Sequence, residues 1–132
     1  MTMRDSILTA RIGNAQTNAD GLVTQEFCFR SDDPTFSGHF PTRPILPGVF
    51  QLEMARLIAQ ESLSSPLAVR EITKAKFLWP IVPEEKIRVE LKLVQKEDAI
   101  QARANFFAGG RSAGEAILQL AKEKNKTADE RV

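Results

Sequence analysis

The sequence predicts an α+β fold in which an antiparallel sheet of about six strands wraps around one central helix. Strict alternation of apolar and charged residues over residues 86–93 is typical of a strand with one buried face. A proline-free run over residues 48–63 instead carries apolar residues around much of its circumference, which indicates a largely buried helix. A sheet that curls around this helix would cover both sets of apolar side chains.

The expected elements follow in the order two strands, a helix and four strands. Residues 7–16 and 22–30 are strand-like, and a turn-rich Asn-Ala-Asp-Gly connection separates them. Pro47 prevents the helix from extending backwards, and Ser64-Ser65-Pro66 ends it. The later strands are expected at residues 71–79, 86–93, 100–106 and 116–120, with a tight turn at Gly109-Gly110 before the last of them.

Two sets of large side chains are expected in the core. The first set lies on the helix and comprises Val49, Phe50, Leu52, Met54, Leu57 and Ile58. The second set is aromatic and comprises Phe50, Phe77, Trp79, Phe106 and Phe107.

Length and composition predict one globular domain over residues 1–132, with a flexible polar tail at residues 122–132. The formal net charge of +1 and the absence of a basic cluster argue against a nucleic-acid partner. The single cysteine, Cys28, cannot form an internal disulfide, which favours a reducing compartment. No secretory signal or bilayer-length apolar run is evident, so we expect a cytoplasmic protein without a membrane partner.

Residues 38–53 combine three groups that can act together in acid–base chemistry. His39, the only histidine, lies in a proline-rich loop that limits the backbone freedom around its ring. Gly48 begins the predicted helix, where free N–H groups favour a developing negative charge. Glu53 follows one and a half turns later in an apolar neighbourhood. A base, an anion-stabilising N–H group and a carboxyl group therefore occur within one short segment.

These three groups suit the elimination of water from a 3-hydroxyacyl thioester. Removal of the C2 proton puts charge on the thioester oxygen, and an oriented N–H group stabilises that charge by about 3–4 kcal/mol. Histidine titrates near neutrality and can accept the C2 proton. The C3 hydroxyl is a poor leaving group, so we expect a carboxylic acid to protonate it.

The run GHFPTRPILPGVFQLE (residues 38–53) closely resembles the active-site segment of the (3R)-hydroxyacyl-[acyl-carrier-protein] dehydratases of the FabA/FabZ type. A second run, KFLWPIVP (residues 76–83), is similar to the end of a strand in that family, and the likeness covers roughly residues 30–120. The resemblance implies a hot-dog fold and no cofactor. It also implies a role for four residues: His39 as the base, the Ile45 carbonyl orienting its ring, the Gly48 N–H binding the thioester oxygen, and Glu53 acting on the 3-hydroxyl directly or through a water.

The same resemblance implies a lyase that acts on acyl chains carried by acyl carrier protein. Each site would combine His39 of one subunit with Glu53 of another, so a homodimer, or a larger assembly of dimers, would be needed for activity. Glutamate at the acid position resembles the FabZ branch. No Pro-His-Arg-x-Pro-like segment precedes Ile7, and Leu57 stands where the family tends to place glutamine. A specialised polyene or polyketide pathway is therefore at least as plausible as fatty-acid synthesis.

Several alternatives stay open at this point. Glu53 and Arg56 are three residues apart on the helix and could form an ordinary ion pair, although we expect Arg56 to point away. His39 has no nearby cysteine or second histidine, so no metal site is expected. The chain could instead be a hot-dog thioesterase, or a non-catalytic acyl-binding subunit that partners an active paralogue. An acidic carrier protein could contact the cations Arg43, Arg70, Lys74 and Lys76.

Overall fold

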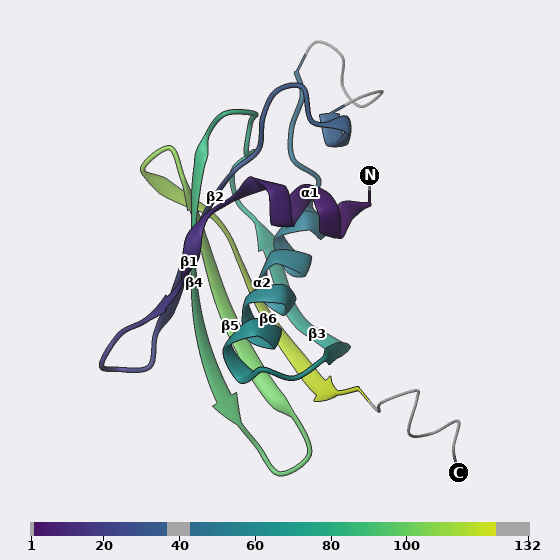
Figure 1. The fold of residues 1–132 in the computed structure, drawn as a ribbon, viewed down its shortest axis with the longest axis vertical. Helices are drawn as coiled ribbons and strands as arrows, with labels where there is room; N and C mark the ends of the chain where they lie inside the picture. Colours follow the sequence, from purple (N-terminus) through teal and green to yellow (C-terminus); the bar gives the residue numbers. More distant parts are fainter. Residues whose placement is uncertain (1, 37–42, 124–132) are drawn as a thin grey trace.

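The computed structural model describes residues 2–36 and 43–123, which form one antiparallel sheet of six strands and two α-helices (Figure 1). The spatial order of the strands is β1-β2-β4-β5-β6-β3. The elements are α1 (Met3–Ala10), β1 (Arg11–Thr17), β2 (Val23–Cys28), the 3-10 helix η1 (Pro34–Phe36), α2 (Gly48–Leu63), β3 (Leu67–Phe77), β4 (Lys86–Gln95), β5 (Ile100–Ala108) and β6 (Arg111–Lys122). The predicted α+β fold, with a six-stranded sheet around a central helix, is confirmed.

Helix α2 lies across one face of the sheet, as Figure 1 shows, and has the bounds that the sequence predicts. Its Met54, Ala55 and Ala59 side chains are completely buried. The facing strands contribute alternate residues to the same core, as expected for a sheet with one covered face. These buried strand residues include Ile87, Val89, Leu91, Ala102, Ala104, Phe106, Ala116, Leu118 and Leu120.

The N-terminal segment is a helix and not the strand that we predicted from residue 7. Thr2 and Asp5 form a capping box: the Thr2 hydroxyl accepts from the Asp5 N–H, and the Asp5 carboxylate accepts from the Thr2 N–H. Ile7 and Ala10 are then buried at helical spacing. The predicted strand is therefore wrong over residues 7–10, and β1 begins at Arg11.

Three of the residues predicted for the core are exposed. Val49 is 52% exposed, and the aromatic residues Phe77 and Trp79 are 51% and 46% exposed. They lie in the first turn of α2 and around the end of β3. Phe50 and Phe106 are buried, so the prediction is confirmed for those two aromatic residues.

Strand β3 forms one edge of the sheet, where it pairs with β6 alone among the described strands. Val69 and Ile72 on this strand are exposed, as are Phe77, Leu78 and Trp79 at its end. We call these five residues the β3 surface. Unpaired backbone groups and large apolar side chains on one edge are typical of a strand that another chain covers.

The last hairpin and the C-terminal strand largely follow the sequence prediction. Gly109 and Gly110 have φ angles of 60° and 76°, which the tight turn between β5 and β6 requires. Strand β6 includes Lys122, which the predicted tail had included, and the remainder of that tail, residues 124–132, lies outside the described residues. Within the described residues, neither α-helix has the length and hydrophobicity that a bilayer-spanning segment requires.

Gly114 allows β6 to pack tightly against α2, which gives a first test of this architecture. A Cβ atom at Gly114 would lie 2.6 Å from Oε1 of Gln51 and 2.9 Å from the carbonyl oxygen of Lys76. We expect Gly114→Ala to lower the free energy of unfolding by about 1–3 kcal/mol, as overpacking does. Urea denaturation measures the change, with the exposed Ser112→Ala on the same strand as the control. Equal stability of both variants would contradict the packing described here.

Candidate active site

The N-terminal end of α2 presents backbone N–H groups that no side chain caps. Pro47 is the N-cap residue, and it offers no side-chain hydrogen bond to the helix. The Phe50 N–H donates to the Pro47 carbonyl oxygen at 3.0 Å, so the first turn is closed. The N–H of Gly48 has no partner within its own helix, because the first four N–H groups of any α-helix lack one. This end of α2 can therefore stabilise a negative charge, as predicted for the thioester oxygen.

Gly48 also provides the space that a neighbouring aromatic ring needs. A Cβ atom at this position would lie 2.7 Å from Cε2 and 2.8 Å from Cζ of Phe77. The end of edge strand β3 thus packs directly against the helix terminus. The glycine is explained by this close contact, and not by a positive φ angle.

The two sequence motifs that carry the family resemblance meet in space. The Leu46 N–H donates to the Ile81 carbonyl oxygen at 2.8 Å, which joins the segment before α2 to the Pro80–Pro83 segment. Between these segments lies a groove of about 410 Å³. It is lined by Arg43, Pro44, Ile45, Trp79, Pro80, Val82 and Pro83. Ile45 thus lies at this groove, whereas His39 lies outside the described residues, so the predicted contact between them stays a prediction.

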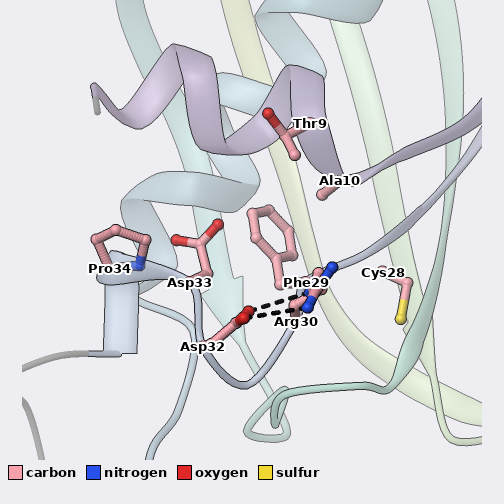
Figure 2. Close-up of a pocket in the computed structure, with 8 residues that line it drawn as sticks. All are labelled: Thr9, Ala10, Cys28, Phe29, Arg30, Asp32, Asp33 and Pro34. Carbon is pink, nitrogen blue, oxygen red and sulfur yellow. Dashed lines mark hydrogen bonds and ion pairs between the residues drawn. The ribbon is translucent and has the colours of Figure 1, made fainter.

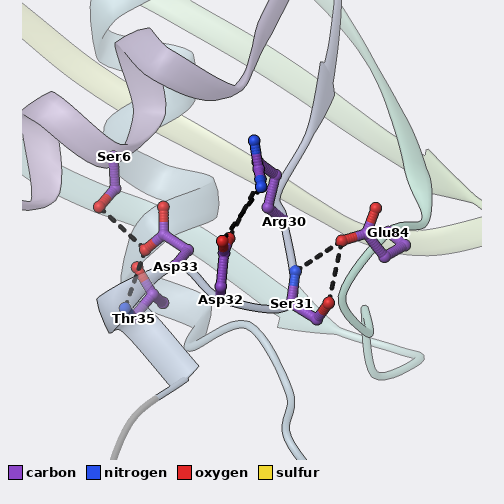
Figure 3. A network of polar contacts seen from close by, with 7 residues as sticks. All are labelled: Ser6, Arg30, Ser31, Asp32, Asp33, Thr35 and Glu84. Carbon is purple, nitrogen blue, oxygen red and sulfur yellow. Dashed lines mark hydrogen bonds and ion pairs between the residues drawn. The ribbon is translucent and has the colours of Figure 1, made fainter.

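Polar contacts anchor the segment that leads from β2 towards His39 (Figure 3). Glu84 has a φ of 68°, and its Oε2 accepts from the N–H and the hydroxyl of Ser31 at 2.6 and 3.1 Å. Asp33 Oδ1 accepts from the Ser6 hydroxyl at 3.1 Å and from the Thr35 N–H at 2.8 Å. Sequence reasoning missed the contacts of Ser31 with Glu84 and of Ser6 with Asp33, because these partners come from distant parts of the chain.

A second cavity of about 310 Å³ lies between the end of α1 and the segment that follows β2 (Figure 2). Its lining includes Cys28 and the exposed ion pair of Arg30 with Asp32. In residues 2–36 and 43–123, no group of three or more histidine, cysteine or acidic side chains is arranged to hold a metal ion.

Glu53 forms a two-pronged ion pair with Arg56 on the next turn of α2. Nε and Nη2 of Arg56 donate to Oε1 and Oε2 of Glu53 at 2.5 and 2.9 Å. The side chains are 17% exposed for Arg56 and 21% exposed for Glu53. Our expectation that Arg56 points away is therefore wrong. The three-residue spacing places both groups on one helix face, where the flat guanidinium fork matches the carboxylate.

The pair affects the pKa of the Arg56 guanidinium group. Hydrogen bonding to the Glu53 carboxylate raises the pKa of Arg56 above its ordinary value, and partial burial opposes this effect. Arg56 is therefore a cation, and its guanidinium group contacts both oxygens of the Glu53 carboxylate. Glu53 lies one and a half turns beyond Gly48 on the same rigid helix, and it retains some access to solvent.

The four cations proposed to receive an acidic carrier protein are not equivalent. Lys74 pairs with Glu115 at 2.7 Å, and this contact lowers the pKa of the Glu115 carboxyl. Arg43 lies at the groove beside Ile45 and is exposed. Arg43 is therefore better placed than Lys74 to contact a ligand that enters this groove.

The six-stranded antiparallel sheet around α2, together with the helix terminus at Gly48, defines a hot-dog protein. Residues 15–113 match the ApeI-like family, described as ApeI dehydratase. The chain belongs to this family of dehydratases, which are lyases.

Curated relatives agree with this assignment. The chain is 33% identical over 99 residues to the 3-hydroxyacyl-[acyl-carrier-protein] dehydratase FabZ of Desulforamulus reducens, an alignment that covers 69% of this chain and 70% of the relative. It is 30% identical over 103 residues to the FabZ of Rhodopseudomonas palustris strain BisB18, covering 71% of this chain and 67% of the relative.

Solved structures support the fold alone, because their sequences are distant. The dehydratase heterocomplex ApeI:P from Xenorhabdus doucetiae matches with a TM-score of 0.71 and 22% identity, over 85% of this chain and 96% of that chain. A hypothetical thioesterase with coenzyme A from Streptococcus pneumoniae TIGR4 matches with a TM-score of 0.66 and 11% identity, over 85% of this chain and 89% of that chain.

The contact between Gly48 and Phe77 can be tested by a pair of substitutions. Gly48→Ala should lower the free energy of unfolding by about 1 kcal/mol, because the new methyl group must displace the Phe77 ring. In a Phe77→Ala background the same change should be neutral or stabilising, since alanine is a better helix former than glycine. Denaturant titration of the four proteins measures both effects. An identical loss in both backgrounds would show that the ring does not set the requirement for glycine.

Proposed function

We propose that this chain dehydrates (3R)-3-hydroxyacyl-[acyl-carrier-protein] thioesters to trans-2-enoyl thioesters in the cytoplasm. The pathway would be fatty-acid biosynthesis or a related polyene or polyketide assembly. The observation that carries the proposal is the placement of Gly48 and Glu53 on one buried helix of an ApeI-like dehydratase, directly after the segment that contains His39. The FabZ relatives, named as acyl-carrier-protein enzymes, support the substrate class.

In the proposed reaction, His39 removes the C2 proton while the Gly48 N–H binds the thioester oxygen that gains charge. The electron pair of the C2–H bond then forms the C2=C3 double bond, and the C3–O bond breaks. Donors at a helix terminus suit this step, because they are oriented before the charge develops. Glu53 acts on the departing 3-hydroxyl group, directly or through a water.

The pairing with Arg56 changes what Glu53 contributes. An ionised carboxylate orients the 3-hydroxyl group as a hydrogen-bond acceptor and has no proton to give. The elimination removes one proton from C2 and returns one proton to the leaving oxygen. We therefore propose that His39 passes the C2 proton to the hydroxyl, which leaves as water while the imidazole returns to its neutral form.

We further propose that a second copy of this chain covers the β3 surface. Support comes from Val69 and Ile72, two large apolar side chains that are exposed along an unpaired strand edge. Phe77 on the same strand touches Gly48, so a partner at this edge would lie next to the candidate site. Such a dimer could combine His39 of one subunit with Glu53 of the other, and larger assemblies of dimers could follow.

A second candidate is a subunit that requires a different hot-dog chain as its partner. The solved dehydratase heterocomplex ApeI:P from Xenorhabdus doucetiae makes this alternative specific, since a chain of similar fold is part of a heterocomplex there. Sedimentation of the purified chain separates the two candidates. A dimer that dehydrates substrate alone supports our proposal, and a silent monomer that becomes active with a second hot-dog chain supports the alternative.

The proposed reaction is tested by incubating the purified chain with (3R)-3-hydroxyacyl-carrier-protein substrates of several lengths. We expect enoyl thioester formation that falls by about a hundredfold or more in His39→Ala and in Glu53→Gln, the usual scale of acid–base contributions. Glu61→Gln on the same helix is the matched control and should keep full activity, because Glu61 pairs with Arg11 on the surface. Release of free thiol without enoyl product would indicate a thioesterase instead.

A mixing experiment tests whether two subunits share each site. Chains carrying His39→Ala and Glu53→Gln should regain activity when they are refolded together, although each is nearly inactive alone. Random pairing makes about half of the dimers mixed, and each mixed dimer has one intact site of two, so we expect roughly a quarter of the wild-type rate. If each chain held its own complete site, mixing would restore nothing.

A further inference from the structure

The guanidinium group of Arg56 is held on both sides. Nε and Nη2 bind the Glu53 carboxylate, and Nη1 donates to Oε1 of Gln60 at 3.0 Å and to the carbonyl oxygen of Leu67 at 2.9 Å. These contacts use four of the five N–H donors of an arginine side chain. Their directions differ, so they leave the planar group little freedom to rotate or to withdraw.

The far side of this network is attached to a rigid part of the fold. The Leu67 N–H donates to Oε1 of Gln60 at 3.0 Å, so Gln60 accepts from Arg56 and from the first residue of β3 at once. Leu67 itself is completely buried. Arg56 therefore links the middle of α2 to the start of the edge strand, and the Glu53 carboxylate takes its orientation from this fixed point.

The near side of the network leaves Glu53 able to bind something else. Each carboxylate oxygen accepts one hydrogen bond from Arg56 and retains a further lone pair. The Glu53 side chain is 21% exposed, so these lone pairs are accessible. A glutamate side chain on a helix ordinarily samples several rotamers. A carboxylate with a two-pronged contact to a planar guanidinium group is instead restricted to one orientation.

We propose that Arg56 is a positioning residue for Glu53, which it holds as an oriented carboxylate that receives the 3-hydroxyl group of the substrate or a water bound to it. This inference rests on the proposed dehydration and deepens it. Arg56 itself touches neither the substrate nor the reacting atoms. Its effect on the rate passes through Glu53, which makes the inference testable.

A double-mutant cycle separates positioning from a general structural role. Arg56→Met is compared with its parent in the wild-type chain and in the Glu53→Gln chain, and kcat and KM are measured with a (3R)-3-hydroxyacyl-carrier-protein substrate. In the wild-type background we expect kcat to fall about tenfold to a hundredfold with little change in KM. The reason is that a displaced Glu53 carboxylate would slow the chemical step by about this factor. In the Glu53→Gln background we expect no further fall, since the group that Arg56 orients is already disabled.

Two further variants control the experiment. Glu61 is the other acidic residue of α2, and it forms an ion pair with Arg11 at 2.7 Å. Arg11→Met removes this partner and should leave kcat unchanged. Arg56→Lys keeps the charge but cannot form the two-pronged contact, so it should recover part of the loss seen with methionine. The same cycle is run with Arg56→Lys, which serves as the test if Arg56→Met does not fold.

The outcomes distinguish this inference from the proposed function. An equal fall of kcat in both backgrounds would assign Arg56 a purely structural role and overturn the inference, as would an unchanged kcat in the wild-type background. Either result would leave the dehydration itself standing. If the wild-type chain forms no enoyl product from any substrate length, alone or with a second hot-dog chain, the proposed function fails and the inference fails with it.

Discussion

The burial of α2 against the curved sheet is the constraint on which the rest of the structure depends. Met54, Ala55 and Ala59 leave no room for the helix to rotate or slide, because they are completely enclosed by strand residues. The positions of Gly48 and Glu53 follow from this, since five residues along an α-helix span about 7.5 Å.

The ion pair between Glu53 and Arg56 is a structural contact of the same side chain to which we assign a chemical role. An exposed pair of this kind would contribute at most about 1 kcal/mol to stability. Here the pair is mostly buried, has two prongs and is extended by Gln60 and by the Leu67 backbone. Such a network is better understood as a means of fixing direction and charge than as a source of stability.

The sequence predicted the central helix and the later strands because their signals are local. Prolines and serines mark the ends of α2, and the alternation in β4 and β5 reports one covered face. The prediction failed where the outcome depends on distant partners. The exposure of Phe77 and Trp79 reflects the edge position of β3, which no local pattern reveals. The helix α1 was missed although the capping pair Thr2 and Asp5 was readable in the sequence.

For the candidate site, the sequence supplied the residue types and the structure supplied the contacts. The contact between the Leu46 and Ile81 segments follows from the folded chain alone, whereas the three-residue spacing of Glu53 and Arg56 had already left their ion pair open as an alternative.

The most direct test of the central claim is a crystal structure with a stable amide analogue of a 3-hydroxyacyl thioester bound. Our account predicts the analogue carbonyl oxygen within hydrogen-bond distance of the Gly48 N–H, the 3-hydroxyl beside the Glu53 carboxylate, and a His39 imidazole facing C2. A complex in which that ring and that carboxylate cannot reach the same acyl chain, in any pairing of subunits, would contradict it.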